Sequence, residues 1–204
     1  MAFNIDNFVN RGLILGGARP SLFDVELNLP QGLTGISGRV RDKFRFTCRA
    51  TSIPASTIAS IDVPYFGRQV KLAGDRTFAD WNVTVMNDED YIVRDAFEAW
   101  HNAINTIVDN KKIPEFTGNS YRSSATVRHY PKTGDGTIKL YSFVNMFPVN
   151  ISEMGLDWET TNQIQTFDVT FAYDYWIPLP ANGTVIPTGA SQSLNPPANE
   201  PPSP

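Results

Sequence analysis

The chain has 204 residues, of which 41% are hydrophobic and 12% aromatic, so it is long enough to bury a substantial core and predicts one folded domain. Its formal net charge of -4 argues against a conventional duplex-DNA-binding protein, because such proteins concentrate Lys and Arg against the phosphates. The single cysteine, Cys48, excludes an internal disulfide and is expected to be a small buried hydrophobe. No apolar run approaches the roughly 20 residues of a membrane-spanning helix, so we expect no membrane insertion. We expect the protein to fold in a cytoplasm.

Residues 1–20 mix polar residues with a Gly-Gly pair and end at an Arg-Pro pair, which predicts an N-terminal arm. Apolar and polar residues then alternate over 22–28 and again over 44–51, the pattern of half-buried strands that could pair as a hairpin. Residues 29–43 between them are rich in Gly and polar residues, and predict a loop longer than ordinary hairpin loops.

The other predicted strands show the same period-two alternation, bounded by Gly and Pro. They lie at residues 60–65, 68–72, 80–86, 123–130, 137–145 and 165–176. Trp81, Val83 and Val85 share one strand face, and Phe167 and Phe171 share another, so both faces are expected to belong to the core.

One amphipathic helix is predicted after residue 87, because apolar side chains recur there at spacings of three and four. These side chains are Val93, Phe97, Trp100, Ile104 and Ile107. Asn87 or Asp88 is positioned to cap the helix, and the acidic residues 88–90 suit the positive end of its dipole. With about eight strands and one helix, the predicted fold class is mainly β (α+β).

The sequence predicts three parts. They are an arm at 1–20, a folded domain at 21–180 and a tail at 181–204, in which six of the 24 residues are proline. The tail contains too few aliphatic residues to form a core of its own.

No reactive constellation emerges from the sequence. The acidic residues 88–90 are consecutive, so they point in different directions and fit a helix start better than a metal site. His101 and His129 are the two histidines, and with Cys48 they make neither a zinc set nor a Cys-His nucleophile. Residues 74–77 lack the spacing of a phosphate-binding loop and predict a locally paired turn. We therefore expect no catalysis, cofactor or metal.

Two blocks, residues 71–90 and 155–176, are the most specific feature of the sequence. They read KLAGDRTFADWNVTVMNDED, and GLDW followed by IQTFDVTFAYDYW. Shorter matching fragments occur in order at 19–26, 44–51 and 124–128. Over about residues 19–177 the chain resembles the tail tube protein family of contractile-tailed bacteriophages.

This resemblance implies a β-sandwich or barrel-like subunit with one flanking helix, and a hexameric ring that closes a continuous β-barrel. Closure would remove exposed strand edges. Rings would stack into a hollow tube inside a contractile sheath, with baseplate and tail terminator proteins as further partners and phage DNA passing through the lumen without specific binding. The implied role is structural, in the tail of the virion, after assembly in the host cytoplasm.

Two sets of candidate residues follow from the implied architecture. The lumen-lining candidates are charged residues of the first two predicted strands, Asp24, Glu26, Arg45 and Arg49. Candidates for the outer surface, facing the sheath or the next subunit, lie on the polar side of the predicted helix: Asp95, Glu98, His101 and Asn102. We expect the lumen to be mainly acidic or neutral, because a basic wall would bind phosphate.

Two other functions fit parts of the sequence. A tube protein of a contractile injection or type VI secretion machine would share the fold but carry effectors, although blocks 74–89 and 163–176 favour the phage branch. A monomeric OB-like or lipocalin-like binding module would need a stable monomer with a ligand. Carboxylates at Asp168 and Asp174 argue against an aromatic strand that stacks on nucleic-acid bases.

Overall fold

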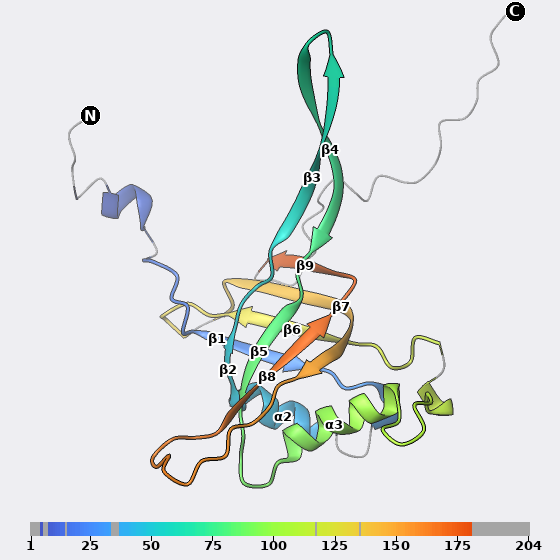
Figure 1. The fold of residues 1–204 in the computed structure, drawn as a ribbon. Coiled ribbons are helices and arrows are strands. Elements are labelled where there is room, and N and C mark those ends of the chain that lie inside the picture. Colours follow the sequence, from blue (N-terminus) through green and yellow to red (C-terminus); the bar gives the residue numbers. More distant parts are fainter. Residues whose placement is uncertain are drawn as a thin grey trace, which may run out of the picture.

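The computed structural model describes residues 5, 8–14, 16–33, 37–116, 118–134 and 136–180 (Figure 1). The predicted tail 181–204 and residues 34–36 of the predicted loop lie outside the described residues. The strands are β1 Phe23–Leu27, β2 Cys48–Thr51, β3 Ser56–Tyr65, β4 Arg68–Phe78, β5 Trp81–Met86, β6 Ser123–His129, β7 Lys139–Ile151, β8 Thr166–Ala172 and β9 Tyr175–Pro180. The helical segments are η1 Phe8–Gly12, η2 Gln31–Leu33, α2 Ser37–Thr47, α3 Ile92–Ile104 and η3 Pro114–Phe116.

Seven antiparallel strands form one sheet in the order β1-β6-β7-β8-β5-β2, with β9 also paired to β7. The long β7 belongs to two halves of this sheet, because residues 139–144 pair with β9 and residues 147–151 pair with β8. The two halves cross one another (Figure 1), and side chains between them form the core. There Trp81 stacks on Phe143 with ring centroids 4.2 Å apart. The predicted mainly-β, sandwich-like fold is confirmed.

β7 passes from one half of the sheet to the other at Asn145, which has a positive φ of 57°. The pairs Ser123 with Met146 and Ala125 with Phe143 show a register shift here, which is a β-bulge. Because of the extra residue, Phe143 and Met146 are both fully buried. The Asn145 side chain donates a hydrogen bond from Nδ2 to Asp174 Oδ2 at 2.7 Å, which ties the bend to the β8–β9 connection.

Replacing Asn145 by Val is expected to lower the free energy of unfolding by about 2 kcal/mol, because a β-branched residue is strained at this φ and the bond to Asp174 is lost. Asn145→Gly removes the same amide but tolerates the backbone, so it should cost about 1 kcal/mol. Urea denaturation of both variants checks the difference. Equal stability of the two would contradict a role for the backbone conformation.

The second helix, α2, corrects the prediction of a loop at 29–43 followed by a strand at 44–51. Val40 and Phe44 are fully buried and Cys48 is 9% exposed, whereas Phe46 is 79% exposed. The apolar positions that matter are therefore four residues apart, which is a helical spacing. The helix α2 packs on β1. β1 pairs with β6 and β2 pairs with β5, and the two do not pair with each other. The predicted hairpin between the first two strands is therefore wrong.

The predicted helix is confirmed as α3, which begins later than predicted. Tyr91 is its N-cap, in a left-handed conformation, and Asp90 Oδ1 accepts a hydrogen bond from the Ile92 N–H at 3.2 Å. Phe97 and Trp100 are fully buried as predicted, but Ile107 lies beyond the helix and is 87% exposed. Among the described residues, no helix is both long and apolar enough to cross a membrane.

Gly74 lies inside β4, so the predicted turn at 74–77 is wrong. The hairpin has a bulge here, because Ile58 pairs with Arg76 and Ser60 pairs with Ala73. Ala59 of β3 therefore lies opposite two residues of β4, Gly74 and Asp75. A Cβ on Gly74 would lie 3.1 Å from the Ala59 carbonyl oxygen. Glycine therefore relieves crowding within a strand here, and β4 continues to Phe78.

Candidate assembly surfaces

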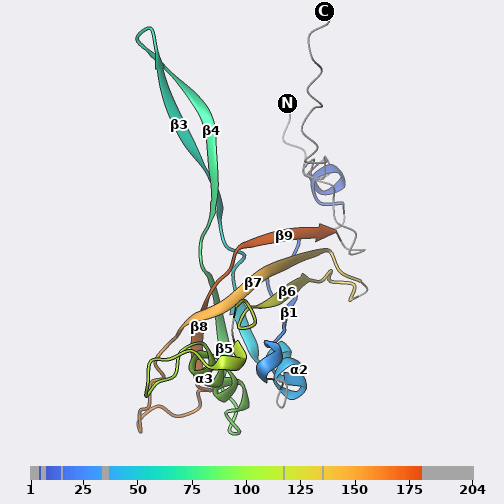
Figure 2. The same cartoon turned by 90° about the vertical axis from the view of Figure 1, so that its right-hand side faces the viewer.

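The hairpin of β3 and β4 forms a two-stranded sheet separate from the seven-stranded one. It projects from the body of the subunit in two perpendicular views (Figures 1 and 2). Every residue of β3 is exposed, and in β4 all but Gly74 and Phe78 are exposed. An isolated two-stranded hairpin is marginally stable in water, so this one needs a surface to pack against.

The hairpin has one apolar and one polar face. On the apolar face Ile61 is paired with Leu72 and Val63 with Val70, and these side chains are 52%, 52%, 39% and 48% exposed. On the polar face Asp62 is paired with Lys71, whose Nζ lies 3.0 Å from the Asp62 carboxylate. We define the apolar hairpin face as these four aliphatic side chains. No described residue of the same subunit covers it, and such a contiguous patch is typical of a protein–protein interface.

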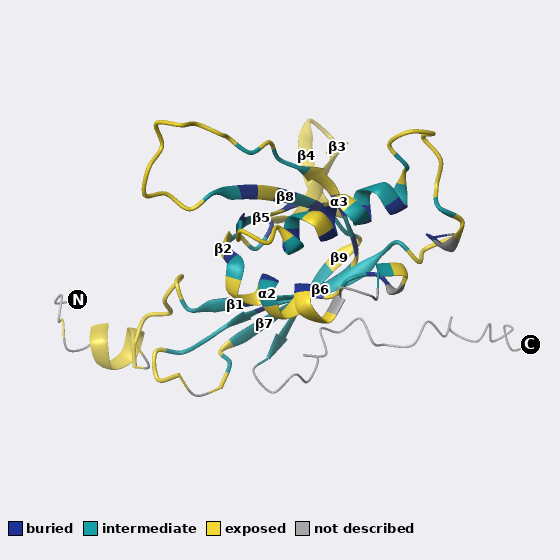
Figure 3. Ribbon diagram, turned by 90° about the horizontal axis from the view of Figure 1, so that it is seen from below, coloured by how far each residue is buried: buried dark blue, intermediate teal, exposed yellow. Residues whose placement is uncertain are grey.

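A second exposed surface lies at the end of the subunit opposite the hairpin (Figures 1 and 2). Its main part is loop 152–165 between β7 and β8, most of which Figure 3 shows in the exposed colour. Leu156 is 83%, Trp158 101% and Ile164 67% exposed. We call this loop, together with the turn at 87–91, the opposite pole.

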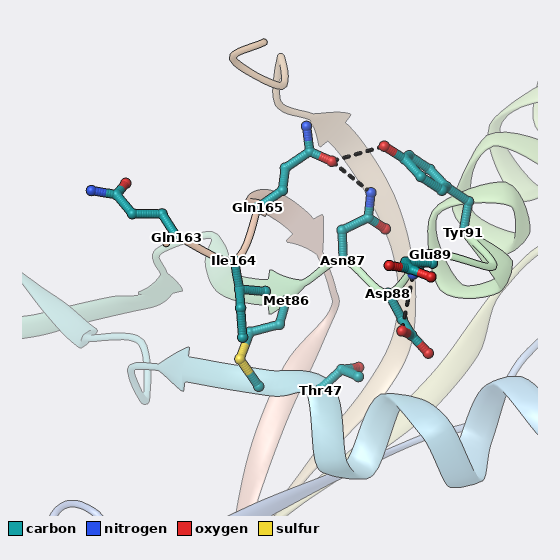
Figure 4. A pocket seen from close by; sticks show the side chains of 9 residues that line it. All are labelled: Thr47, Met86, Asn87, Asp88, Glu89, Tyr91, Gln163, Ile164 and Gln165. Atoms are coloured by element: carbon teal, nitrogen blue, oxygen red, sulfur yellow. Dashed lines mark hydrogen bonds between the residues drawn. The ribbon is translucent and has the colours of Figure 1, made fainter. Parts of the chain in front are cut away.

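The opposite pole contains a hollow of about 530 Å³ (Figure 4). Asn87 Nδ2 and Tyr91 Oη both donate hydrogen bonds to Gln165 Oε1, at 2.9 and 3.0 Å, and so join the turn to the loop. Asp88 and Asp90 are paired with Lys43 of α2. Hydrogen bonding to this ammonium group lowers the pKa of both carboxyls.

Three of the four lumen candidates lie in one ion cluster on β1, α2 and β6. Asp24 is 8% exposed, and its Oδ2 accepts hydrogen bonds from Arg45 Nε at 2.5 Å and from Tyr130 Oη at 2.9 Å. Arg128 pairs with Glu26 and lies 3.7 Å from Asp24 Oδ1. The cluster holds α2 against β1, which is a structural role within the subunit.

Arg49, the fourth lumen candidate, lies on β2, is not part of this cluster and is exposed. Cys48 beside it is buried as predicted, and burial raises the pKa of its thiol to about 12. Groups of three or more His, Cys, Asp or Glu side chains that could hold a metal ion do not occur among the described residues.

The outer-surface candidates divide into two exposed and two half-buried residues of α3. Asp95 and Glu98 are exposed, and Glu98 accepts a hydrogen bond from Arg94 Nε at 2.7 Å. Burial lowers the pKa of His101, whose Nε2 is buried without a hydrogen-bond partner. Asn102 Oδ1 accepts a hydrogen bond from the Ile107 N–H at 3.1 Å, so its amide holds the chain that follows the helix.

An open groove of about 490 Å³ separates α3 from β7. Its lining residues are mostly apolar, and include Ile104, Ile107, Phe147, Val149 and Ile151, with Glu98, His101 and Asn102 at its helical side. The sequence pattern did not reveal this groove or the apolar hairpin face, although the alternation of Ile61 and Val63 was visible in it.

A β-sandwich with a protruding hairpin, whose apolar face is exposed, is the architecture expected of an assembly subunit. The sequence matches the family model described as phage tail tube protein over residues 18–178. Tail tube protein gp19 of Enterobacteria phage T4 is 38% identical over 162 residues, which cover 78% of this chain and 90% of that protein. This chain therefore belongs to the phage tail tube protein family, as the sequence resemblance predicted.

Solved structures show the same fold at low sequence identity. The tube-terminating cap of the anti-feeding prophage gives a TM-score of 0.58 at 16% identity, covering 81% of this chain and 92% of that chain. The sheath–tube complex of an extracellular contractile injection system gives 0.51 at 14% identity, covering 88% and 99%. The predicted tube fold is confirmed by these matches.

Proposed function

We propose that this chain forms hexameric rings that stack into the hollow tail tube of a contractile phage, through which the genome is delivered. The apolar hairpin face carries this proposal, because a lone subunit would leave it in water. In the described part of the chain, β2 pairs only with β5 and β9 only with β7. Ring closure would pair such free edges.

The strand content is compatible with a bore wide enough for DNA. If each of six copies contributes about four strands, about 24 strands at a spacing of roughly 4.8 Å and a tilt of 35–45° give a backbone radius of about 23–26 Å. Side chains then leave a lumen on the order of 35–40 Å, which is wider than duplex DNA.

The charge of the subunit supports passage of DNA without specific binding. The net charge is -4, and Arg45 and Arg128, two of the cations near the lumen candidates, are paired with carboxylates. A wall whose cations are mostly paired with carboxylates limits the counterion release that drives DNA binding. We place Glu26, Arg45 and Arg49 at the lumen, with Asp24 beneath them, and assign no catalytic or cofactor role to any residue.

The proposed partners are a contractile sheath outside the tube, and baseplate and tail terminator proteins at its ends. Solved structures of similar fold come from a sheath–tube complex, a baseplate and a tube-terminating cap. Asp95 and Glu98 are exposed on α3 and are the sheath-facing residues we propose. The protein would reside in the virion tail after assembly in the host cytoplasm.

A tube of an injection machine is the second candidate, since the same fold occurs in such machines. The phage function is preferred because a phage tail tube protein is 38% identical over most of the chain, against 16% or less for the injection-machine structures.

Size-exclusion chromatography with light scattering, followed by electron microscopy of the same fractions, tests the proposal. Hollow rings of six copies and stacked tubes are the expected result. Added duplex DNA should not co-sediment with the tubes at physiological salt. A protein that stays monomeric at high concentration, with a small molecule bound in the groove between α3 and β7, would favour the binding-module alternative.

A further inference from the structure

We propose that the aliphatic residues Val185 and Ile186 of the C-terminal tail bind back into an apolar hollow of their own subunit, between the two halves of the sheet. We call it the β1–β7 hollow. Its lining residues include Pro20, Phe23, Ile53, Val127, His129 and Tyr141. The contact forms within a single subunit, and its tail segment lies beyond the family match, which ends at residue 178.

The β1–β7 hollow is a place where the described residues leave the core partly uncovered. Phe23, Ile53 and Tyr141 pack against the buried core but are themselves only half-buried. Apolar surface of this kind is stabilised when a further apolar group excludes water from it. A cavity of about 150 Å³ accepts a molecule of benzene. The hollow measures about 280 Å³, so it has room for two aliphatic side chains.

The described chain ends at the edge of this hollow. Antiparallel pairing places Phe23 of β1 opposite His129 of β6, and His129 opposite Lys139 of β7. Lys139 in turn pairs with Pro180, the last residue of β9. Residues that lie opposite one another in a sheet point to the same face, and the first three line the hollow. Pro180 therefore continues their row on the same face of the four neighbouring strands (Figure 1).

The tail can reach the whole hollow from this starting point. Neighbouring strands lie roughly 4.8 Å apart, so the three spacings from Pro180 to Phe23 amount to about 14 Å. The five residues from Pro180 to Val185 span up to about 17 Å when extended. A tether this short gives an effective concentration in the mM range, which favours the tail of the same copy over that of another copy.

The sequence after Pro180 favours a return to the sheet face. Asn182 and Gly183 form a dipeptide that is typical of a tight turn. Pro178 and Pro180 lack the N–H groups that a returning strand would need at the edge of β9, so the edge is a poor partner. Residues 181–199 contain no charged side chain, and no charge is therefore carried into the apolar hollow.

Cross-linking of the full chain tests the contact. In a variant with Val185→Cys and Pro20→Cys, a short bis-maleimide should join the two cysteines within one chain, which gives a faster-migrating monomer band in denaturing electrophoresis. Pro20 lines the hollow and is exposed, and cysteine at 185 keeps a small apolar side chain. The matched control combines Val185→Cys with Lys132→Cys in the exposed turn between β6 and β7, and should react at least about fivefold more slowly. Cys48 is buried and should not react.

Hydroxyl-radical footprinting gives a second readout, because it reports the exposure of side chains. In the full chain, Phe23 and Tyr141 should be oxidised about threefold more slowly than in a variant with Val185→Asp and Ile186→Asp, since carboxylates are unfavourable in an apolar hollow. The control variant Leu194→Asp, whose change lies further along the tail, should give the oxidation rates of the parent chain.

Two results would overturn the contact. One is equal oxidation of Phe23 in the parent chain and in the double-Asp variant. The other is a link between positions 185 and 20 that joins two chains, because the hollow would then hold the tail of another copy. Both experiments are read on dilute subunits, so a failure to form tubes would contradict the proposed function and leave this contact standing.

Discussion

A chain in which Ile61, Val63, Val70 and Leu72 are all replaced by Thr is expected to remain a folded monomer and to form no tubes. The four side chains are 39–52% exposed in the lone subunit, so they contribute little to its own stability. Thr is β-branched and keeps the strand propensity of the hairpin, while its hydroxyl makes burial unfavourable. The substitutions therefore act on association and spare the fold.

The expected loss is large because it is repeated around a ring. Each replacement removes roughly 1 kcal/mol of apolar burial, so the six copies of the proposed ring lose on the order of 20 kcal/mol of association free energy. The matched control is Asp62→Thr with Lys71→Thr on the polar face, which should still form tubes. Electron microscopy and light scattering read the outcome, and tubes of normal length from the four-Thr variant would show that the apolar hairpin face is not an interface.

Trp81→Ala is expected to lower the free energy of unfolding by about 3–5 kcal/mol, the largest effect of a single core substitution. Trp81 is fully buried, stacks on Phe143 at 4.2 Å, and meets Phe171 at 5.3 Å between ring centroids. Its Nε1–H also donates to Thr51 Oγ1 at 2.8 Å. The side chain thus joins both halves of the sheet to β2.

Urea denaturation of Trp81→Ala in the four-Thr background, where subunits stay monomeric, measures this loss without a contribution from assembly. Trp81→Phe keeps an aromatic ring but removes the indole N–H, so it should cost about 1–2 kcal/mol. If Ala and Phe at this position cost the same, the stability would come from the hydrogen bond, and the account of stacking between the two halves of the sheet would be wrong.

Strands with one buried face were predictable because apolar and polar residues alternate along them, and the apolar residues are the buried ones. Trp81, Val83 and Val85 are all buried, as are Phe167 and Phe171. The sequence also located α3 through Phe97 and Trp100. In these segments only one period fits the apolar positions, so local pattern and final structure agree.

α2 was not predictable in this way, because its apolar residues satisfy two periods. Phe44, Phe46 and Cys48 alternate as in a strand, yet Phe44 and Cys48 are also four apart, as in a helix. Packing decides between them: α2 lies on β1 and leaves Phe46 exposed. Strand pairing was likewise hidden, since β1 and β6 are separated by about a hundred residues and their register depends on the whole fold.

The candidate surfaces were predicted in part. Asp24 and Arg45 were predicted to lie on two strands, whereas in the structure Arg45 lies on α2 and forms an ion pair with Asp24 of β1. The alternation of Ile61 and Val63 predicted a strand, and the sequence alone could not tell that its apolar face would lack a cover within the subunit. Loop 152–165 has no periodic pattern, so the exposure of Trp158 emerges only from the three-dimensional arrangement.

A cryo-electron microscopy reconstruction of the assembled protein tests the central claim most directly. The account predicts a hollow tube of stacked six-membered rings in which the apolar hairpin face is covered by another copy. Tubes in which Ile61, Val63, Val70 and Leu72 face solvent, or an assembly without a bore, would contradict it.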